Sequence, residues 1–246
     1  MAKSSPFEVI HERLGATFAE YDGWRLVKDY GDEASEQRAL MEASAAFDLS
    51  SFGRITVTGG DSWKLIDSLL AGKSEEPKEN SWIWSVAAEP GGAGGYVLRV
   101  GRMGQSYMLL TRAGDREAVY GLVSSQAVGG SRFNEVKVTD ITEQTGMLGI
   151  YGPGAFESVR KILPLDISGL EAGDVMKISF FMISITILRG SWVGLDGVEL
   201  ICPASVGPMA AGAVAKYHKR ANITPAGMEC LEKALSLGGA ETPAGD

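Results

Sequence analysis

A segment of the chain occurs twice, and this internal repeat limits the possible folds more than any other feature. Residues 53–70 align without a gap with residues 146–163. In each copy, apolar residues first alternate with others, as in a strand, and then recur every three or four positions, as in an amphipathic helix. Glycines separate the two patterns and allow the backbone to turn. Each copy therefore predicts a strand, a glycine turn and a helix.

The residues that follow each copy also correspond. After each helix, the sequence predicts two more strands and then a second amphipathic helix. Such a strand-helix-strand-strand-helix unit packs its helices on an antiparallel or mixed sheet, so the expected fold class is α+β with two related units. The expected elements are residues 96–102, 105–111 and 115–125 after the first copy, and residues 175–189, 197–202 and 206–219 after the second.

The segments outside the repeat predict further elements. Residues 6–14 have the spacing of a short helix, and residues 17–30 predict a hairpin. Residues 32–46 predict a helix that Asp32 caps, because a short acidic side chain accepts hydrogen bonds from the first backbone amides. The polar, proline-containing residues 73–81 predict an exposed loop.

The charge of the chain argues against two classes of partner. Its 246 residues carry a net charge of -8 and contain no run of lysine or arginine, so no nucleic-acid or anionic-membrane surface is expected. The longest apolar run, residues 178–188, is too short to span a bilayer and predicts a buried strand. The charged N-terminal segment is unlike a secretory signal, so a cytoplasmic location is expected.

The cysteines and histidines do not predict a metal site. Cys202 and Cys230 belong to no Cys-x-x-Cys motif and are expected to be buried thiols. His11 and His218 each lie in a helical pattern among charged residues and are expected at the surface. A zinc site needs clustered ligands of these types, so none is expected.

Four motifs occur in an order that is more specific than any one of them. Residues 22–30 contain Gly-Trp, and residues 36–50 run Glu-Gln-Arg-Ala-Leu-Met-Glu-Ala-Ser-Ala-Ala-Phe-Asp-Leu-Ser. Residues 189–200 run Arg-Gly-Ser-Trp-Val-Gly-Leu-Asp-Gly-Val-Glu-Leu, and residues 225–232 run Pro-Ala-Gly-Met-Glu-Cys-Leu-Glu. Together they resemble the aminomethyltransferase family, which comprises the T-protein of the glycine cleavage system and its folate-binding relatives in one-carbon metabolism.

The resemblance implies a domain organisation. Members of the family have three domains around a channel that holds tetrahydrofolate, and the last domain is a β-rich barrel. This chain is expected to contain only the first two. Residues 1–52 with 140–246 would form one discontinuous α+β domain, and residues 53–139 would form the inserted second domain.

The departures from the family pattern bear on catalysis. Active T-proteins carry a pair of aspartates where this chain has Gly95 and Tyr96, and one of that pair is needed for transfer of the aminomethyl carbon. Neither glycine nor an ordinary tyrosine can replace a carboxylate beside a developing cation. The family's folate-binding tyrosine, glutamate and arginine correspond to Trp192, Leu195 and Leu231. The catalytic residues of this chain are therefore unknown.

Other residues could still hold a folate. A pterin needs a flat apolar slot and a few hydrogen bonds to its edge, and the glutamate tail needs a cation. The alternative for each candidate is a role in packing or in a surface ion pair. The expected folate contacts are Trp84, Tyr96, Arg112, Arg189, Trp192, Asp196 and Glu199.

Three functions stay open on this basis. The first is a protein of the family that binds a reduced folate with degenerate or altered catalysis. The second is an active tetrahydrofolate-dependent aminomethyltransferase of glycine cleavage, in which Asp48 or Asp196 would act instead. The third is a non-catalytic subunit or interaction module, in which a protein partner or a homo-oligomer replaces the missing barrel.

Overall fold

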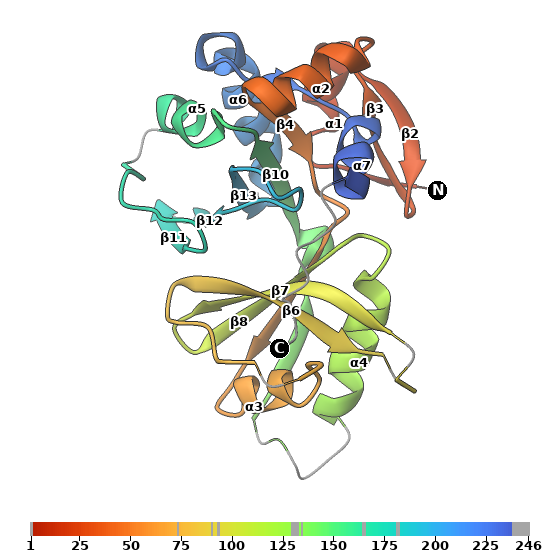
Figure 1. Ribbon diagram of the computed structural model, residues 1–246, viewed down its shortest axis with the longest axis vertical. Helices are drawn as coiled ribbons and strands as arrows, with labels where there is room; N and C mark the ends of the chain where they lie inside the picture. The colour runs from red at the N-terminus through yellow and green to blue at the C-terminus, as the bar shows by residue number, and fades with distance from the viewer. Residues whose placement is uncertain are drawn as a thin grey trace. The chain divides into compact units, whose positions relative to one another are not determined.

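The chain folds into two compact units (Figure 1). The computed structural model describes residues 2–72, 74–89, 91–92, 94–128, 133, 135–163, 166–180 and 183–237. The described residues of the first unit end at Ser51 and resume at Glu143, and the second unit spans Phe52–Thr142. Each unit is α+β, as expected. Whether these units are the domains that the resemblance implies stays a prediction.

The first unit contains a sheet with the strand order β11-β12-β13-β10-β4-β14. Its neighbouring strands are antiparallel except β14, which runs parallel to β4. Helices α5 and α6 pack on the apolar face of the sheet, around residues such as Ile150 and Val198. The bounds are β4 Ala45–Asp48, β10 Thr145–Tyr151, α5 Ala155–Ile162, β11 Val175–Phe180, β12 Ile183–Arg189, β13 Gly197–Pro203, α6 Gly207–Ala221 and β14 Thr224–Pro225.

A small sheet with the order β1-β3-β2 belongs to the same unit. The predicted hairpin of residues 17–30 is formed by β2 and β3, and Asp32 caps α2 by accepting a 3.0 Å hydrogen bond from the Ser35 amide. The prediction that α2 reaches residue 46 is wrong. The bounds are β1 Lys3–Ser4, α1 Glu8–Arg13, β2 Thr17–Tyr21, β3 Trp24–Asp29, α2 Glu33–Glu42 and α7 Met228–Leu237, with a short 3-10 turn η2 at Ala204–Val206.

The second unit contains a sheet with the order β6-β7-β8-β5-β9, in which every pair is antiparallel. Helices α3 and α4 cover one face of this sheet, where Ile55, Val100 and Val119 are completely buried. The bounds are β5 Gly53–Thr58, α3 Ser62–Asp67, β6 Ser81–Ala88, β7 Gly95–Met103, β8 Ser106–Thr111, α4 Arg116–Val128 and β9 Lys137–Asp140; the 3-10 turn η1 is Thr142–Gln144.

The two sheets have the same design, as the repeat predicts, but three strands lie between the two helices of each unit where two were predicted. In the second unit the strands lie in the order β6-β7-β8-β5, and in the first unit the strands β11-β12-β13-β10 lie in the same order. Each strand of one series therefore has its counterpart in the other. The fifth position, next to β5 or β10, is filled by β9 in one unit and by β4 in the other. Because β4 directly precedes β5 in the chain and β9 directly precedes β10, each repeat places its leading strand in the sheet of the other.

The apolar run at residues 178–188 is not a single buried strand. Residues of the run belong to two antiparallel strands, since β11 ends at Phe180 and β12 begins at Ile183. Both strands have one face towards the core, so apolar residues are needed on each side of the turn. Residues 181–182 lie outside the described residues.

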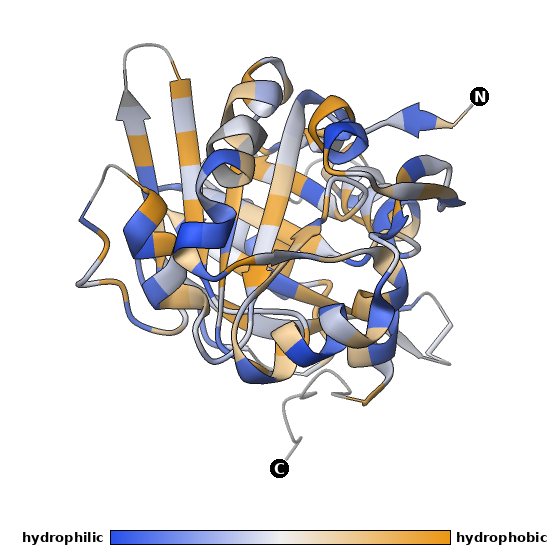
Figure 2. Cartoon of the chain, turned by 90° about the horizontal axis from the view of Figure 1, so that it is seen from above, coloured by the Kyte–Doolittle hydropathy of each residue, from blue (hydrophilic) through white to orange (hydrophobic). Residues whose placement is uncertain are grey.

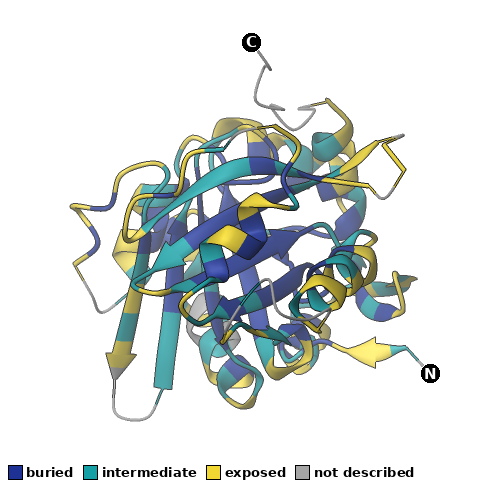
Figure 3. Cartoon of the chain, turned by 90° about the horizontal axis from the view of Figure 1, so that it is seen from below, coloured by how far each residue is buried: buried dark blue, intermediate teal, exposed yellow. Residues whose placement is uncertain are grey.

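Burial follows the sheets. Figure 2 shows hydrophobic and hydrophilic residues interspersed along strands and helices, and Figure 3 shows the strands as the most buried elements while the helices expose one side. Cys202 and Cys230 are both buried, which confirms that prediction. In the part of the chain that the structure describes, no helix is both long and apolar enough to cross a membrane.

Candidate functional site

Gly95, one of the two positions where the resemblance places the aspartate pair, has no room for a side chain. It begins β7 and lies opposite Ala88 of β6. A Cβ atom built on Gly95 would lie 2.4 Å from Cγ1 of Val86 and 2.9 Å from the carbonyl oxygen of Ala87. Carbon atoms in proteins pack at about 3.5–4.0 Å, so any side chain here would displace the neighbouring strand. The local packing is built for glycine.

Tyr96 and Trp84 lie on opposite faces of the sheet in the second unit. Tyr96 is half-buried and packs against the core beneath α3 and α4, whereas Trp84 is opposite Arg99 on β7 and faces the other way. The Tyr96 hydroxyl lies 3.5 Å from Oε1 of Glu89. Desolvation first, and the charge of Glu89 second, raise the pKa of Tyr96. The structure does not bring these two predicted folate contacts together.

Trp84 is part of an aromatic pair beside a buried cation. The rings of Trp82 and Trp84 meet edge to face, with centroids 5.6 Å apart and an angle of 87°. The guanidinium carbon of Arg99 lies 4.9 Å from the Trp82 centroid and 5.4 Å from that of Trp84, within cation–π range. Both indoles are half-buried. This part of β6 therefore presents two half-buried indoles at right angles, packed beside the buried side chain of Arg99.

Arg112 follows the end of β8 in the same unit. Its side chain is half-buried, and its Nε atom is buried with no hydrogen-bond partner among the described residues. A buried guanidinium N–H without an acceptor costs free energy, and a carboxylate would satisfy it well. Among the predicted folate contacts, Arg112 thus carries a buried donor that has no acceptor among the described residues.

Arg189 and Asp196 bind each other in the first unit. Two nitrogens of the Arg189 guanidinium donate to the two carboxylate oxygens of Asp196, one of them over 3.0 Å. The guanidinium carbon also lies 4.0 Å from the ring centre of Phe156. Asp196 accepts in addition from the amide of Gly197 at 2.8 Å. The pair closes the turn between β12 and β13, and its hydrogen bonds occupy two nitrogens of Arg189 and both carboxylate oxygens of Asp196.

Trp192 and Glu199 are buried in the first unit. Trp192 is only 1% exposed, and Glu199 is fully buried on β13. Oε1 of Glu199 accepts a hydrogen bond of 2.6 Å from the hydroxyl of Tyr151 on β10. A buried carboxylate needs such partners to remain in an apolar core. The arrangement gives Glu199 a role inside the sheet, and its part in ligand binding stays a prediction.

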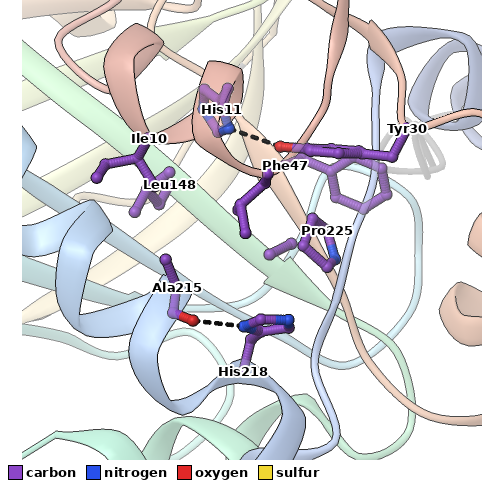
Figure 4. A pocket seen from close by; sticks show the side chains of 10 residues that line it. Ile10, His11, Tyr30, Phe47, Leu148, Ala215, His218 and Pro225 are labelled. Carbon is purple, nitrogen blue, oxygen red and sulfur yellow. Dashed lines mark hydrogen bonds between the residues drawn. The ribbon is translucent and has the colours of Figure 1, made fainter.

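Sequence reasoning missed a buried polar cluster in the first unit. His11 on α1 was expected at the surface, but it is only 9% exposed. Its Nδ1 lies 2.6 Å from the Tyr30 hydroxyl, and its Nε2 lies 3.2 Å from Oδ2 of Asp48. The signal was present, because His11 shares one helix face with Phe7, Ile10 and Leu14. Figure 4 shows the bond between His11 and Tyr30.

A cavity of about 30 Å³ adjoins this cluster. His218 borders it and, contrary to expectation, is half-buried, with Nδ1 2.6 Å from the carbonyl oxygen of Ala215 (Figure 4). Sites for drug-sized ligands measure roughly 300–1,000 Å³, so this cavity cannot hold a folate. Its lining is Ile10, His11, Leu14, Tyr30, Ala46, Phe47, Leu148, Ala215, His218 and Pro225.

The neighbours of Asp48 keep it ionised. Burial pushes the pKa of Asp48 upward, but hydrogen bonds from His11, Ser5 and Ser50 and the charge of His11 outweigh it, so its pKa lies below the usual aspartate value. Burial, with the charge of Asp48 next, raises the pKa of Tyr30. Tyr30 is therefore a neutral hydrogen-bonding group and Asp48 a buried anion.

Comparison with known proteins settles the family. The profile of the GCVT N-terminal domain matches residues 7–243, nearly the whole chain. The chain belongs to this family. The resemblance to aminomethyltransferases is thereby confirmed, and this GCVT protein has curated relatives with that name. It is 26% identical to the aminomethyltransferase of Cutibacterium acnes and 27% identical to that of Moorella thermoacetica, in each case over 97% of its length.

The GCVT protein spans 67% and 66% of the lengths of these two relatives, about two thirds. Among solved structures it resembles the glycine cleavage system aminomethyltransferase T of Bartonella henselae, with a TM-score of 0.81 and 20% identity over 94% of this chain and 61% of that one. It also resembles a chain of heterotetrameric sarcosine oxidase from Corynebacterium sp. U-96, with a TM-score of 0.53 and 12% identity over 78% of this chain and 93% of that one. At these identities the structural likeness establishes the fold alone.

Proposed function

We propose that this GCVT protein binds a reduced folate and does not transfer an aminomethyl group. The observation that carries the proposal is the packing at Gly95, where a Cβ atom would lie 2.4 Å from Val86. Transfer of an aminomethyl carbon develops positive charge on nitrogen, which a nearby carboxylate stabilises and deprotonates. At Gly95, the first of the two positions, the neighbouring strand leaves no room for that carboxylate, and the second position holds Tyr96.

The other candidate acids of the sequence are engaged elsewhere. Asp196 is bound by the Arg189 guanidinium and by the Gly197 amide. Asp48 is bound by His11 and by the Ser50 amide and is almost completely buried. Tyr96 cannot replace an acid, because its raised pKa keeps the hydroxyl protonated at neutral pH. These contacts argue against the alternative of an active aminomethyltransferase.

Two features of the second unit support folate binding. The half-buried indole of Trp84 offers an aromatic ring for a pterin to stack on, and the Nε of Arg112, which has no acceptor among the described residues, offers a donor for a carboxylate. Family membership supports the same ligand class. The cytoplasmic location expected from the sequence stays part of this proposal.

A titration tests the binding half of the proposal. Tetrahydrofolate should quench the tryptophan fluorescence at micromolar concentration, because a stacked pterin absorbs the emission of the nearby indoles. Arg112→Ala should weaken binding of tetrahydrofolate and leave binding of a tetrahydropterin without the glutamate tail unchanged. A flat titration up to millimolar tetrahydrofolate would contradict the proposed ligand.

An activity assay tests the other half. The protein, mixed with tetrahydrofolate and an aminomethyl-lipoyl carrier, should form no methylene-tetrahydrofolate above the uncatalysed rate. A complete aminomethyltransferase serves as the positive control. Turnover comparable to that control would overturn the argument from Gly95.

A second candidate function is that of a subunit in a larger complex. The resemblance to a chain of heterotetrameric sarcosine oxidase favours it, since 93% of that chain is covered. On this view a protein partner, or further copies of the chain, complete the assembly. Light scattering, together with the tetrahydrofolate titration, distinguishes the two candidate functions. A monomer that binds tetrahydrofolate supports the first, and an oligomer that does not bind tetrahydrofolate supports the second.

A further inference from the structure

The chain contains two Asp-Gly dipeptides, and the structure places them in opposite surroundings. Asp22-Gly23 is the two-residue turn that joins β2 to β3, since Tyr21 pairs with Trp24 on either side of it. Asp196-Gly197 lies at the start of β13, inside the six-stranded sheet. Asp-Gly is the sequence in which an aspartate reacts most readily with its own backbone, because glycine has no side chain to obstruct the approach. The surroundings of each dipeptide therefore decide whether that reaction takes place.

The reaction needs only the dipeptide and water. The backbone nitrogen of the glycine bonds to Cγ of the aspartate and gives up its proton, and one carboxyl oxygen leaves as water. Water then opens the resulting succinimide ring at either carbonyl. One opening restores the aspartate, and the other yields isoaspartate, in which the main chain runs through the former side chain. The ring closes only if the carboxyl group is free to lose an oxygen and the backbone can rotate at the aspartate.

Asp22-Gly23 meets both conditions. Both residues are exposed, with φ values of 49° and 76°, which is the conformation that a type I′ hairpin turn requires. Within the described residues, the Asp22 carboxylate takes part in no hydrogen bond or ion pair, and the Gly23 amide has no acceptor. A Cβ atom at Gly23 would meet nothing within 4 Å, so the turn has open space in which to move. The tip of an exposed hairpin resists such a rotation weakly, because it opens at little cost in free energy.

Asp196-Gly197 meets neither condition. Both carboxylate oxygens of Asp196 accept from the Arg189 guanidinium, so neither leaves as water unless the ion pair breaks. The Gly197 amide keeps its proton in a hydrogen bond of 2.8 Å to Oδ1 of Asp196. Gly197 is buried, and a Cβ atom there would lie 2.7 Å from the Gly190 carbonyl oxygen, so the backbone is packed too closely to rotate. The fold therefore holds this dipeptide in a form that does not react.

We propose that Asp22-Gly23 is a modification site at which isoaspartate forms spontaneously in the folded protein, while Asp196-Gly197 stays unmodified. The product inserts an extra carbon atom into the main chain at the turn. Because the length of the turn sets the pairing register of a hairpin, the modified chain no longer matches the β2–β3 pairing. Trp24 follows the turn directly and is only 3% exposed, so a shifted register also disturbs its packing. The modification therefore lowers the stability of the small sheet β1-β3-β2.

An ageing experiment on the intact wild-type protein tests the proposal. The protein is kept folded for several weeks at physiological temperature and neutral pH, and is then digested and mapped by chromatography with mass spectrometry. Isoaspartate leaves the mass of a peptide unchanged but shifts its retention. The peptide that contains Asp22 should accumulate isoaspartate at least about tenfold faster than the peptide that contains Asp196, because the buried dipeptide reacts only after local opening.

The same experiment in urea separates the effect of the fold from that of the local sequence. In the unfolded chain both dipeptides are free, so their rates should become similar. The proposal is overturned if the Asp22 peptide stays unmodified in the folded protein, or if the Asp196 peptide reacts as fast or faster. It is also overturned if the difference persists in urea, because the fold would then not be its cause.

The variant Asp22→Gly is the matched control. Gly-Gly also fits a type I′ turn, so the hairpin should form as in the wild type, but isoaspartate cannot form there. After ageing, thermal unfolding should show a lowered midpoint for the wild type and an unchanged midpoint for Asp22→Gly. An equal loss in both proteins would contradict the proposed effect of the modification on the small sheet.

Discussion

Residues that the sequence assigns to folate lie in two regions, the turn between β12 and β13 and the sheet that contains the hairpin of β6 and β7. The two regions differ in whether these residues have partners within the fold. In the first, Arg189 is bound by Asp196, and Glu199 by Tyr151, inside one unit. In the second, Trp84 is half-buried on one face of the sheet, and Arg112, which follows β8 of the same sheet, has a buried donor with no acceptor among the described residues. Polar residues of one region bind each other within the fold, whereas those of the other belong to the folate site that we propose.

The difference shows which residues of the 189–200 segment the fold itself uses. The segment 189–200 retains the Asp-Gly pair of the family motif as Asp196 and Gly197, which build the turn, although Leu195 stands where the family has a glutamate. Gly197, for example, admits no Cβ atom, which would lie 2.7 Å from the Gly190 carbonyl oxygen. We therefore expect substitutions in the β12–β13 region to lower stability, and substitutions of the exposed hairpin residues to lower folate affinity.

The largest effect is expected for Glu199→Ala. The change removes a buried side chain and leaves the Tyr151 hydroxyl without its acceptor, so the free energy of unfolding should fall by about 3 kcal/mol. Urea denaturation measures it. Glu199→Gln keeps an oxygen for Tyr151 and should cost about 1 kcal/mol. A tenfold loss of folate affinity in Glu199→Gln, with stability unchanged, would place Glu199 among the ligand contacts and break the comparison.

Gly95→Asp is expected to cause the second largest loss of stability. The new side chain collides with Val86 and with the backbone of Ala87, and such overpacking should lower the free energy of unfolding by about 2 kcal/mol without creating transferase activity. Gly121→Asp is the matched control, because Gly121 is exposed on α4 with open space at its Cβ, and its effect should stay within about 0.5 kcal/mol. A stable Gly95→Asp protein that forms methylene-tetrahydrofolate would show that the position accepts the acid.

Arg189→Met should have a smaller effect. The methionine retains the apolar contact with Phe156 but loses the ion pair with Asp196, whose side chain is 35% exposed and therefore screened by water. The expected loss of unfolding free energy is about 1 kcal/mol. Arg189→Lys keeps the charge but loses the bidentate contact with Asp196. Its free energy of unfolding should lie between those of the wild type and Arg189→Met. Thermal unfolding measures the stability of the wild type and both variants. If all three bind tetrahydrofolate equally well, the β12–β13 region serves stability and not ligand binding.

Trp84→Leu should affect stability least. Because Trp84 is half-buried, the loss of unfolding free energy should be about 0.5 kcal/mol, while the dissociation constant for tetrahydrofolate should rise about tenfold through lost stacking. Tyr96→Phe, on the opposite face, is the control and should leave the affinity unchanged. Isothermal titration calorimetry measures the affinities. Equal affinities of the wild type and Trp84→Leu for tetrahydrofolate would contradict the proposal that a pterin stacks on Trp84.

The sequence predicts most elements because their signals are local. The repeat gives both strand-turn-helix units, and Asp32 marks the start of α2 correctly. The end of α2 was missed because residues 43–46 continue its pattern, whereas Ala45–Asp48 pairs with β10 about a hundred residues later. Strand formation there depends on a partner that no local pattern reveals.

The sequence by itself thus determined the repeat, the α+β class and the family of this protein, because periodicity and motifs are written within short stretches of chain. The tertiary structure decided which sheet β4 and β9 complete, that His11 is buried beside Asp48, and that Gly95 is closed to any side chain. These features arise from contacts between separate strands and helices, where the shape and charge of the distant partner determine what fits.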